Sequence, residues 1–401
     1  MAKVCHLIMV DDKGNHNKTY DMKQINDNQF EASWGRYGAR KQTRIYSMSV
    51  WDSLYQQKLD KGYTDITDLK SVTVSTSNNQ YDEIEDKAVR ELVDALLRYA
   101  NECVKRNYQV STKEVTRIMI RKAQDSIDRL SELADRKTDC YYFNKELKRL
   151  FVIIPRQMKN VSDYLSNSED DYLEVIDREQ KLLDVMASLV DAEPDGTGEC
   201  SSKKGKTILD AFGLKIRPCN AEEEANVRRK LTSESEHKFK MAFRIEQKDL
   251  EERYKKYVKE HHLSRKSEHF FWHGTRNQNV WSIMKNGMLL NPKAPITGKM
   301  FGYGLYFAPR AKKSIKYTSI NGVLYTHGTS DEGFLFVMKV AYKNPLDVYS
   351  WDAKYQSYRG QNVRATGNDA IFAHKGSMLV NDEVIVYDEA QVCPRYLVVL
   401  K

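Results

Sequence analysis

The spacing of apolar residues changes twice along the chain and divides it into three regions. Up to about residue 75, short apolar and aromatic runs alternate with turn-forming Gly, Asn and Asp, as in Asp11–Asn15. Such interrupted short runs predict a small β-rich domain over residues 1–75, with one helix around Val50 to Leu59. The Ser-, Thr- and Asn-rich stretch Ser71–Asn79 predicts a linker after it.

Apolar residues recur at helical spacing in the second region, from about residue 82 to 190. They predict three helices, marked by Ala88, Val89, Leu92, Val93, Leu96 and Leu97, by Val115, Ile118, Ala123, Ile127, Leu130 and Ala134, and by Tyr172 to Leu189. The pattern Ser111-x-x-Glu114 is a capping box and predicts the start of the second helix. Pro155 predicts that a helix either breaks or begins there, after Phe151–Ile154. We therefore predict an all-α helical bundle over residues 82–190, which by itself implies no chemistry.

A polar segment over residues 191–206 lacks any apolar period and predicts a loop or linker. The third region, from about residue 205 to 401, combines helical and strand-like patterns of apolar residues. It predicts a charged helix from Phe239 to about Glu260 and short strands at 270–272, 334–338, 383–387 and 396–400. Strands separated by long loops favour an antiparallel α+β layout over alternating βαβ units. The whole chain is therefore predicted to be a multidomain α+β protein.

Composition narrows the class of protein. A chain of 401 residues with 41% hydrophobic and 30% charged residues predicts a soluble protein of roughly two to four domains. It has neither an apolar run of membrane-spanning length nor a signal-peptide layout at its start, so we expect an intracellular protein with no membrane partner. The net charge of +8 suits a polyanionic partner without identifying one.

The cysteines and glycines argue against several common sites. The six cysteines form no CxxC or CxC pair, so zinc fingers are disfavoured and we expect reduced thiols and no bound metal. They are Cys5, Cys103, Cys140, Cys200, Cys219 and Cys393. No GxGxxG follows a predicted strand and no GxxxxGK[ST] is present, which disfavours a Rossmann domain and a P-loop.

Three segments of the third region carry candidate chemistry: Phe271–Asn279 with the helix Val280 to Asn286 after it, Gly298–Tyr317, and Asn381–Tyr387. Each has an ordinary structural interpretation. A histidine at a strand end is usually a satisfied polar residue, a Gly-aromatic loop is usually a turn, and a glutamate entering a strand is usually solvated. In this order and in one domain, however, the three segments form a specific pattern.

That pattern resembles the poly(ADP-ribose) polymerase family, whose His-Tyr-Glu signature is matched by His273, Tyr306 and Glu383. Trp34-Gly35-Arg36 matches the tripeptide that names the WGR domain. The resemblance covers nearly the whole chain, in the order of the short, DNA-dependent members that lack zinc fingers.

The resemblance implies a function for each region. The small β-rich domain over 1–75 would be a WGR domain, the bundle over 82–190 a regulatory helical domain, and 205–401 an antiparallel-sheet ADP-ribosyltransferase catalytic domain. The substrate would be NAD+.

Roles around the NAD+ substrate follow from the same resemblance. Cleavage of the bond between nicotinamide and ribose develops an oxocarbenium ion, which the Glu383 carboxylate can stabilise through the 2′-hydroxyl of the nicotinamide ribose. His273 would hydrogen-bond the adenosine ribose. The backbone of Gly274 and the hydroxyl of Ser314 would hold the carboxamide. Tyr306 and Tyr317 would sandwich the nicotinamide ring. Further residues would line the NAD site (Thr275 and Asn279) or the acceptor side (Met300 and Lys313).

Two positions depart from the family pattern. Leu289 stands where the family often has an adenine-pocket arginine, and the chain is one residue shorter before Ala294-Pro295. We therefore expect altered or weaker adenine recognition. Asn381 stands where the family often has a tyrosine, two positions before the glutamate. This leaves polymer length and branching open, but not the transfer itself.

The WGR segment implies DNA ends or nicks as a partner. Trp34 would stack on a sugar or base, and Arg36 would reach a terminal phosphate and the helical domain. Arg40, Lys41 and Arg44 would contact backbone phosphates without reading sequence. The alternative for this segment is a β-turn with a buried Trp and solvated bases. In the family, the helical domain restrains the NAD cleft until DNA binds.

The function implied is a DNA-break-activated, poly-type NAD+ ADP-ribosyltransferase that modifies proteins, including itself. Two alternatives remain: mono-ADP-ribosylation of protein or DNA ends, and a DNA-end-binding scaffold with an inactive cleft. We expect the protein in the nucleus if its source is a eukaryote, and in the cytoplasm or at the nucleoid if the source is a prokaryote or a virus.

Overall fold

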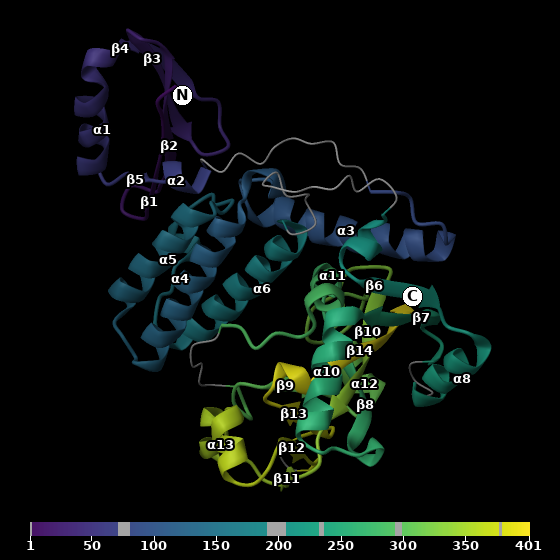
Figure 1. The fold of residues 1–401 in the computed structure, drawn as a ribbon. Helices are drawn as coiled ribbons and strands as arrows, with labels where there is room; N and C mark the ends of the chain where they lie inside the picture. Colours follow the sequence, from purple (N-terminus) through teal and green to yellow (C-terminus); the bar gives the residue numbers. More distant parts are fainter. Residues whose placement is uncertain (1, 71–80, 191–205, 232–235, 293–298, 377–378) are drawn as a thin grey trace. The chain divides into compact units, whose positions relative to one another are not determined.

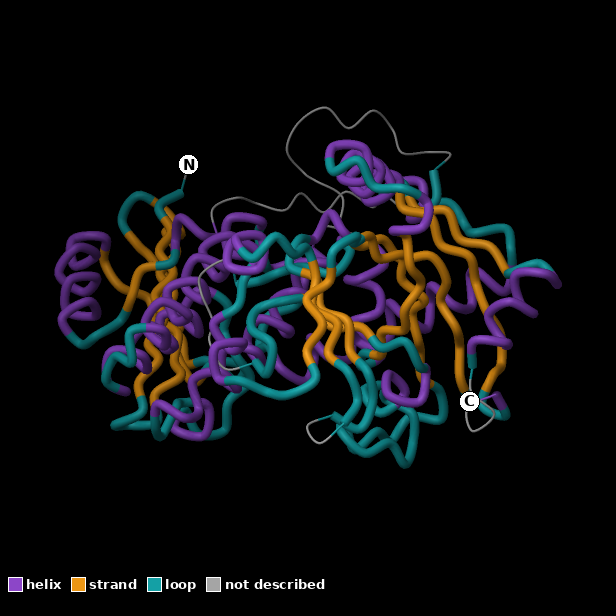
Figure 2. Tube along the Cα trace, turned by 90° about the horizontal axis from the view of Figure 1, so that it is seen from below, coloured by secondary structure: helices purple, strands orange, loops and turns teal. Residues whose placement is uncertain are grey.

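The computed structural model describes residues 2–70, 81–190, 206–231, 236–292, 299–376 and 379–401. The chain divides into two compact units (Figures 1 and 2). The first combines Met1–Asn78 with Cys103–Cys200, and the second combines Asn79–Glu102 with Ser201–Lys401. The predicted linker at 71–79 and nearly all of the one at 191–206 lie outside the described residues.

The first unit begins with a five-stranded antiparallel sheet in the order β4-β3-β2-β1-β5. Its strands are β1 (Val4–Asp11), β2 (His16–Asn26), β3 (Gln29–Arg36), β4 (Gln42–Ser47) and β5 (Thr64–Asp65). Helix α1 (Trp51–Asp60) confirms the single helix predicted here, and the short α2 (Thr67–Lys70) follows. Trp51 of α1 packs edge-on against Phe30, so α1 covers one face of the sheet.

Four longer helices follow: α3 (Lys87–Asn107), α4 (Arg117–Asp135), α5 (Cys140–Ile153) and α6 (Tyr172–Val190). Three of them confirm the predicted helices, and α5 ends just before Pro155 as that residue predicts. The pattern did not predict α5 itself, although it buries Phe143, Leu147, Leu150 and Phe151 at helical spacing. Helix α3 contributes residues to both units.

The predicted start of α4 is wrong. The capping box of Ser111 and Glu114 closes a short 3-10 turn, Thr112–Glu114. The N-cap of helix α4 is Thr116, five residues after the predicted cap Ser111. The Thr116 hydroxyl accepts a hydrogen bond from the Met119 amide at 3.2 Å. Both Ser111 and Thr116 have the side-chain oxygen that a helix start requires, so the local pattern could not choose between them.

The second unit contains two sheets. The larger has the order β6-β7-β14-β10-β8 and the smaller β11-β12-β13-β9. The bounds are β6 (Leu214–Pro218), β7 (Phe239–Gln247), β8 (Glu268–Gly274), β9 (Leu305–Phe307), β10 (Gly333–Ala341), β11 (Pro345–Val348), β12 (Ala370–Ala373), β13 (Glu383–Val386) and β14 (Val392–Leu400). The mixed, largely antiparallel layout is confirmed, but β11 and β12 pair in parallel.

The helix predicted from Phe239 is wrong in its first half. Residues Phe239–Gln247 form strand β7, and only Lys248–Glu260 is helical, as α10. Phe243 and Ile245 are buried where β7 runs between β6 and β14, so tertiary pairing decides this segment. Among the described residues of this unit, further α-helices are α7 (Ile208–Ala211), α8 (Ala221–Lys230), α11 (Asn277–Asn286), α12 (Ala311–Ile315) and α13 (Gly360–Ala365).

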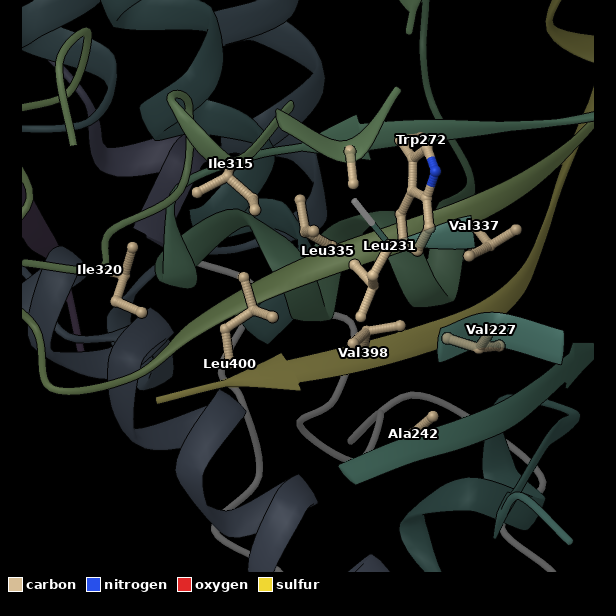
Figure 3. Packing of buried hydrophobic residues seen from close by; sticks show 11 residues of the cluster. Val227, Leu231, Ala242, Trp272, Ile315, Ile320, Leu335, Val337, Val398 and Leu400 are labelled. Carbon is tan, nitrogen blue, oxygen red and sulfur yellow. The ribbon is translucent and has the colours of Figure 1, made fainter. Parts of the chain in front are cut away.

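A buried cluster supports the end of β8, where the signature histidine lies (Figure 3). Trp272 pairs in register with Val337 of β10, and Leu335 pairs with Val398 of β14. Residues paired across strands project to the same face, so these side chains form one apolar layer. Ile315 of α12 and Val227 of α8 belong to the same cluster.

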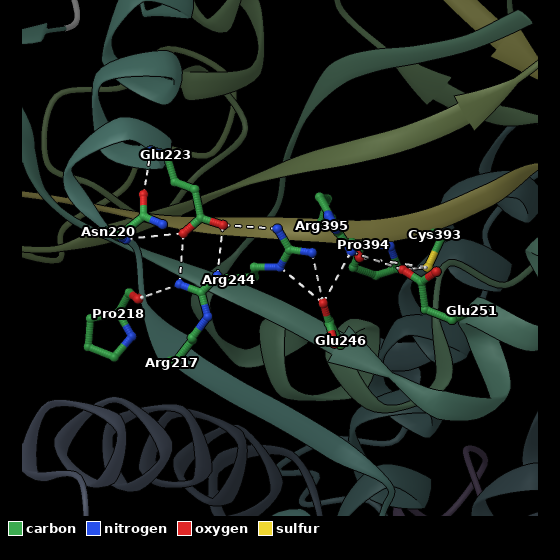
Figure 4. Close-up of polar contacts among 10 residues, drawn as sticks. All are labelled: Arg217, Pro218, Asn220, Glu223, Arg244, Glu246, Glu251, Cys393, Pro394 and Arg395. Atoms are coloured by element: carbon green, nitrogen blue, oxygen red, sulfur yellow. Dashed lines mark hydrogen bonds and ion pairs between the residues drawn. The ribbon is translucent and has the colours of Figure 1, made fainter. Parts of the chain in front are cut away.

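A charged network ties helices α8 and α10 to the larger sheet (Figure 4). Glu223 of α8 accepts hydrogen bonds from Arg217 at 2.7 Å and from Arg244 at 2.9 Å. The hydrogen bond from Arg217 is the main reason that the pKa of Glu223 is lowered to about 2. Glu246 and Glu251 continue the network through Arg395, at 3.5 Å and 3.4 Å.

Candidate active site

The two sheets of the second unit are joined beside the signature histidine. Trp272 of β8 and Ala308, just after β9, exchange two backbone hydrogen bonds of 2.9 Å. In the smaller sheet, Tyr306 of β9 pairs with Ile385 of β13. This pairing places the end of β8, the middle of β9 and the start of β13 next to one another.

His273 and Gly274 occupy the last two positions of β8. The Nδ1 atom of His273 lies 3.2 Å from the carbonyl oxygen of Tyr306, so the imidazole is held to the strand that carries the signature tyrosine. A Cβ atom on Gly274 would run into the backbone carbonyl of Ser314. The close approach of these two backbones therefore requires glycine at position 274.

Tyr306 is held by its hydroxyl, which donates to the Gly302 carbonyl at 2.8 Å and accepts from the Phe301 amide at 3.1 Å. Burial raises the pKa of this phenol, so it stays neutral. Ser314 is buried on α12, and its hydroxyl donates to the Trp272 carbonyl at 3.1 Å. Both side chains are therefore fixed in place by backbone partners.

Glu383 is the first residue of β13, and its carboxylate forms an ion pair with the ammonium of Lys313 on α12. Both side chains are largely shielded from solvent, with 13% and 14% exposure. Burial is the main reason that the pKa of Lys313 is lowered to about 8; the nearby Lys316 also lowers it, and Asp382 raises it.

The other predicted NAD-site residues lie around this centre. The Asn279 amide donates to the Thr275 hydroxyl at 3.0 Å, across the first turn of α11. The Tyr317 backbone amide donates to the Ser314 carbonyl at 3.1 Å, and the Tyr317 ring is 41% exposed. On the predicted acceptor side, Met300 is partly buried, and its carbonyl accepts from the Trp351 indole at 3.3 Å.

The two departures from the family pattern lie at the edges of the site. Leu289 is partly buried after Gly287, which ends α11 with a φ of +76°. The next residue, Leu290, donates its amide to Glu389 at 2.7 Å. Asn381 is partly buried in the turn before Glu383. Residues 293–298, where the chain is one residue shorter, lie outside the described ranges.

Sequence reasoning missed contacts that depend on distant segments. Asn277, at the start of α11, is buried and donates to the Glu332 carbonyl at 3.0 Å and to the Ser330 hydroxyl at 3.3 Å. The pairing of Lys313 with Glu383 was not predicted either. Seventy positions separate these two residues in the sequence, and no local pattern links charges that far apart.

The residues predicted to contact DNA lie in the first unit and differ in the protein groups that they contact. Trp34 stacks on Tyr20, with ring centroids 5.7 Å apart. The Arg36 guanidinium donates to the carbonyls of Asn15 and, in the segment after α5, of Met158 and Lys159, at 2.9, 3.1 and 2.6 Å. Lys41 pairs with Asp21, whereas Arg40 and Arg44 are exposed. The predicted contact of Arg36 with the helical region is thus present in the structure.

The described residues contain neither a cluster of metal-ligating side chains nor a membrane-spanning helix. Within those ranges, no group of three or more His, Cys, Asp or Glu side chains is placed to hold a metal ion. Across the same ranges, no helix is long and apolar enough to cross a membrane.

Comparison with known proteins gives a consistent set of relatives. A family model for the poly(ADP-ribose) polymerase catalytic domain matches residues 221–401. Uncharacterized protein 101L of Invertebrate iridescent virus 6 is 33% identical over 188 residues, which are 47% of this chain and 78% of that protein.

Two cellular enzymes are also similar. Poly [ADP-ribose] polymerase 1 of Gallus gallus is 30% identical in an alignment of 181 residues that covers 40% of this chain, and that of Arabidopsis thaliana is 26% identical in an alignment of 278 residues that covers 62% of this chain. The matched parts are only 17% and 27% of these two enzymes. The Arabidopsis match covers more of this chain than residues 221–401, so it extends into the preceding residues.

Proposed function

This chain belongs to the poly(ADP-ribose) polymerase family and carries the catalytic domain of an NAD+ ADP-ribosyltransferase, and we propose that it is a poly-type protein ADP-ribosyltransferase activated by DNA breaks. One observation carries the proposal: the strand pairings that join β8, β9 and β13 gather His273, Tyr306 and Glu383 around one centre. Gly274 supports it, because a side chain at this position would run into the Ser314 carbonyl, so the strand that carries His273 packs closely against α12.

The transfer exchanges one bond for another at the anomeric carbon of the nicotinamide ribose. The bond from that carbon to the nicotinamide nitrogen breaks, nicotinamide leaves with the bonding electrons, and an acceptor oxygen forms the new bond and loses its proton. Positive charge develops on the ribose in between. In this proposal the Glu383 carboxylate stabilises this charge and orients the acceptor hydroxyl. Its ion pair with Lys313 supports the role, because it fixes the carboxylate in position.

A labelled-NAD+ assay tests the transfer itself. The purified full chain is incubated with labelled NAD+, with and without nicked DNA that bears a 5′-phosphate. We expect labelled protein and released nicotinamide, with more label when DNA is present. No label on protein in either reaction would overturn the proposal. The exposed Glu260 serves as a matched control, because Glu260→Gln should behave as wild type while Glu383→Gln loses elongation by about 10²- to 10³-fold.

Asn381 favours a second candidate, the addition of single ADP-ribose units to protein or DNA ends. A side chain near the reacting glutamate is placed to influence the acceptor, and asparagine there replaces a ring with a small amide. Product sizing on a gel separates the two reactions. Long ladders support the poly-type reaction, and a single added unit supports the alternative. The remaining candidate, motivated by Leu289, is a DNA-end-binding scaffold with an inactive cleft. Release of nicotinamide in the NAD+ assay would exclude it.

We assign residues 1–75 as a WGR domain and 82–190 as a regulatory helical domain, with DNA ends or nicks as the activating partner. Arg36 supports this assignment, since it links the β-rich sheet to the segment after α5. A second contact supports regulation of the NAD site from α3. The Tyr99 hydroxyl donates to Glu332 at 2.8 Å, and the carbonyl of Glu332 holds Asn277 at the start of α11.

Activation by DNA then requires a two-state element that DNA biases. We propose that the α3 contact with Glu332 is part of that element. Tyr99→Phe removes the hydrogen bond and keeps the ring, so we expect higher activity without DNA and a smaller stimulation by DNA. An unchanged ratio of activities with and without DNA would count against this role. The enzyme would work wherever the cell or virus keeps DNA, which is the nucleus in a eukaryote.

A further inference from the structure

Residues 321–330, which we call the return loop, fold back along the segment 316–320 that carries Tyr317. The Tyr325 amide donates to the Lys316 carbonyl at 3.2 Å, and the Ser330 amide to the Ser319 carbonyl at 2.9 Å. The Asn321 amide closes the loop onto the Ser330 carbonyl at 2.8 Å. Two backbone hydrogen bonds therefore hold the return loop beside the segment that carries Tyr317, and the third closes the loop on itself.

A glycine makes this close packing possible. A Cβ atom on Gly328 would run into the carbonyl oxygens of Ser319 and Ile320. The hydroxyl of Thr326 also donates to the Thr318 carbonyl, which adds a side-chain contact between the two segments. The return loop thus has a defined position rather than resting on the surface through side chains alone.

Within this loop, Tyr325 packs directly against Tyr317. Their ring centroids are 4.9 Å apart and the rings are inclined by 36°. The Lys316 ammonium lies 5.6 Å from the centre of the Tyr325 ring, on the residue whose carbonyl holds the Tyr325 amide. Tyr325 is 51% exposed, and it is held by its backbone amide and by the contact of its ring with Tyr317.

Tyr317 needs such support if it is to stack on a ligand. Tyr317 is 41% exposed, so without a neighbouring contact its side chain would lose rotational freedom when a ligand binds. Ordering a side chain of this kind weakens binding by about 2- to 10-fold. A neighbouring ring that already restricts Tyr317 removes part of that cost before the ligand arrives.

We propose that Tyr325 is a positioning residue for the nicotinamide ring of NAD+, and that it acts by holding the Tyr317 ring in its stacking orientation. The proposal rests on the proposed function, which places nicotinamide against Tyr317. Tyr325 itself does not touch the reacting atoms. It sets the orientation of the ring that does the stacking, and thereby the affinity for substrate rather than the rate of bond cleavage.

Four proteins test this role: wild type, Tyr325→Ala, Tyr325→Phe and Leu324→Ala. Leu324 is the matched control, because it is 60% exposed in the same loop and adjacent in sequence. We measure kcat and KM for NAD+, and the Kd of benzamide, a nicotinamide analogue, by calorimetry. Tyr325→Ala should raise KM and the benzamide Kd by about 3- to 10-fold with kcat within about 2-fold of wild type. Tyr325→Phe and Leu324→Ala should match wild type.

Three results would overturn the proposal. An unchanged benzamide Kd in Tyr325→Ala would show that the ring does not support Tyr317. A lower KM or Kd in that variant would show that Tyr325 obstructs the site. Equal losses in Tyr325→Phe and Tyr325→Ala would show that the ring is not the cause. Benzamide binding needs no turnover, so a wild-type protein that binds benzamide but transfers nothing would refute the proposed function and leave this test intact.

Discussion

Single residues of the site are constrained by contacts that allow little substitution. Gly274 faces the Ser314 carbonyl. The Tyr306 hydroxyl donates a hydrogen bond to the Gly302 carbonyl, and Glu383 forms an ion pair with Lys313. Each of these contacts joins two segments that are distant in sequence. The chemistry of one residue therefore depends on the position of another element, and a change at one residue tests that dependence.

Gly274→Ala tests the close backbone approach at the end of β8. The added methyl group must push α12 away from β8, so we expect a destabilisation of about 1–3 kcal/mol and a benzamide Kd raised by at least about 10-fold. Thermal unfolding and calorimetry measure the two effects. Gly376→Ala is the matched control, because its Cβ would lie 4.0 Å from the nearest atom, the Tyr349 carbonyl. Equal behaviour of the two variants would contradict the expectation.

The Lys313 ammonium predicts how the rate depends on pH. The pKa of Lys313 is about 8, so the ion pair with Glu383 is present below that pH and is lost as the pH rises through it. We expect elongation to fall above about pH 8. Lys313→Arg should shift this fall to higher pH, because arginine stays protonated.

Thermal stability provides the control for this pH effect. The pKa of Lys313 in the folded protein lies below its ordinary value of 10.5, so folding favours the neutral form and this group adds stability as the pH rises from about 8 to 10.5. The loss of rate should therefore occur without unfolding that originates at Lys313. Identical pH–rate profiles for wild type and Lys313→Arg would refute this role of the ion pair.

Secondary-structure elements show where local pattern and tertiary contacts compete. Helices α3, α4 and α6 follow from apolar residues at helical spacing, since such a stripe must be buried. Strand β7 has polar and charged residues between its apolar positions, and the charged helix α10 follows it directly. Only the pairing of β7 with β6 on one side and β14 on the other makes its residues a strand and not the first turns of α10.

The corrected start of α4 predicts which cap stabilises the first unit. Thr116→Ala removes the hydroxyl that accepts from the Met119 amide and is buried. We expect a loss of about 1 kcal/mol in the free energy of unfolding. Ser111→Ala, in the exposed 3-10 turn, should cost less than about half of that. Chemical denaturation of both variants measures the difference, and a larger effect at Ser111 would support the original placement of the helix start.

At the scale of the whole molecule, the first unit combines the β-rich sheet with most of the helical region. Arg36 and the Lys148 ion pair with Asp12, at 2.5 Å, connect the two within that unit. The guanidinium of Arg36 is engaged by carbonyls and the ammonium of Lys41 by a carboxylate, so we expect the larger share of the proposed phosphate contacts from the exposed Arg40 and Arg44, the second of which lies over the Tyr46 ring.

The salt dependence of DNA binding tests this assignment. Removing two phosphate contacts reduces the slope of log K against log salt by about 1.8. We expect that change for Arg40→Gln combined with Arg44→Gln, measured by fluorescence anisotropy on nicked DNA. Lys61→Gln, an exposed cation after α1, is the control and should leave the slope unchanged. Equal slopes for the double variant and wild type would show that the two arginines do not contact phosphates.

The amino-acid sequence by itself determined the order of the β-rich, helical and mixed regions, three of the long helices, and four strands of the second unit. It did so because apolar spacing is a local property that each segment expresses alone. It also placed the candidates His273, Tyr306 and Glu383 in one region through their order along the chain.

The tertiary structure alone decided how these candidates meet. The register of β9 on β13, the bridge between Trp272 and Ala308, and the pairing of Lys313 with Glu383 all join segments far apart in sequence. The same is true of Tyr325 against Tyr317, which depends on the return loop folding back. Such contacts depend on loop closure and on burial of both partners at once, and no local pattern encodes either.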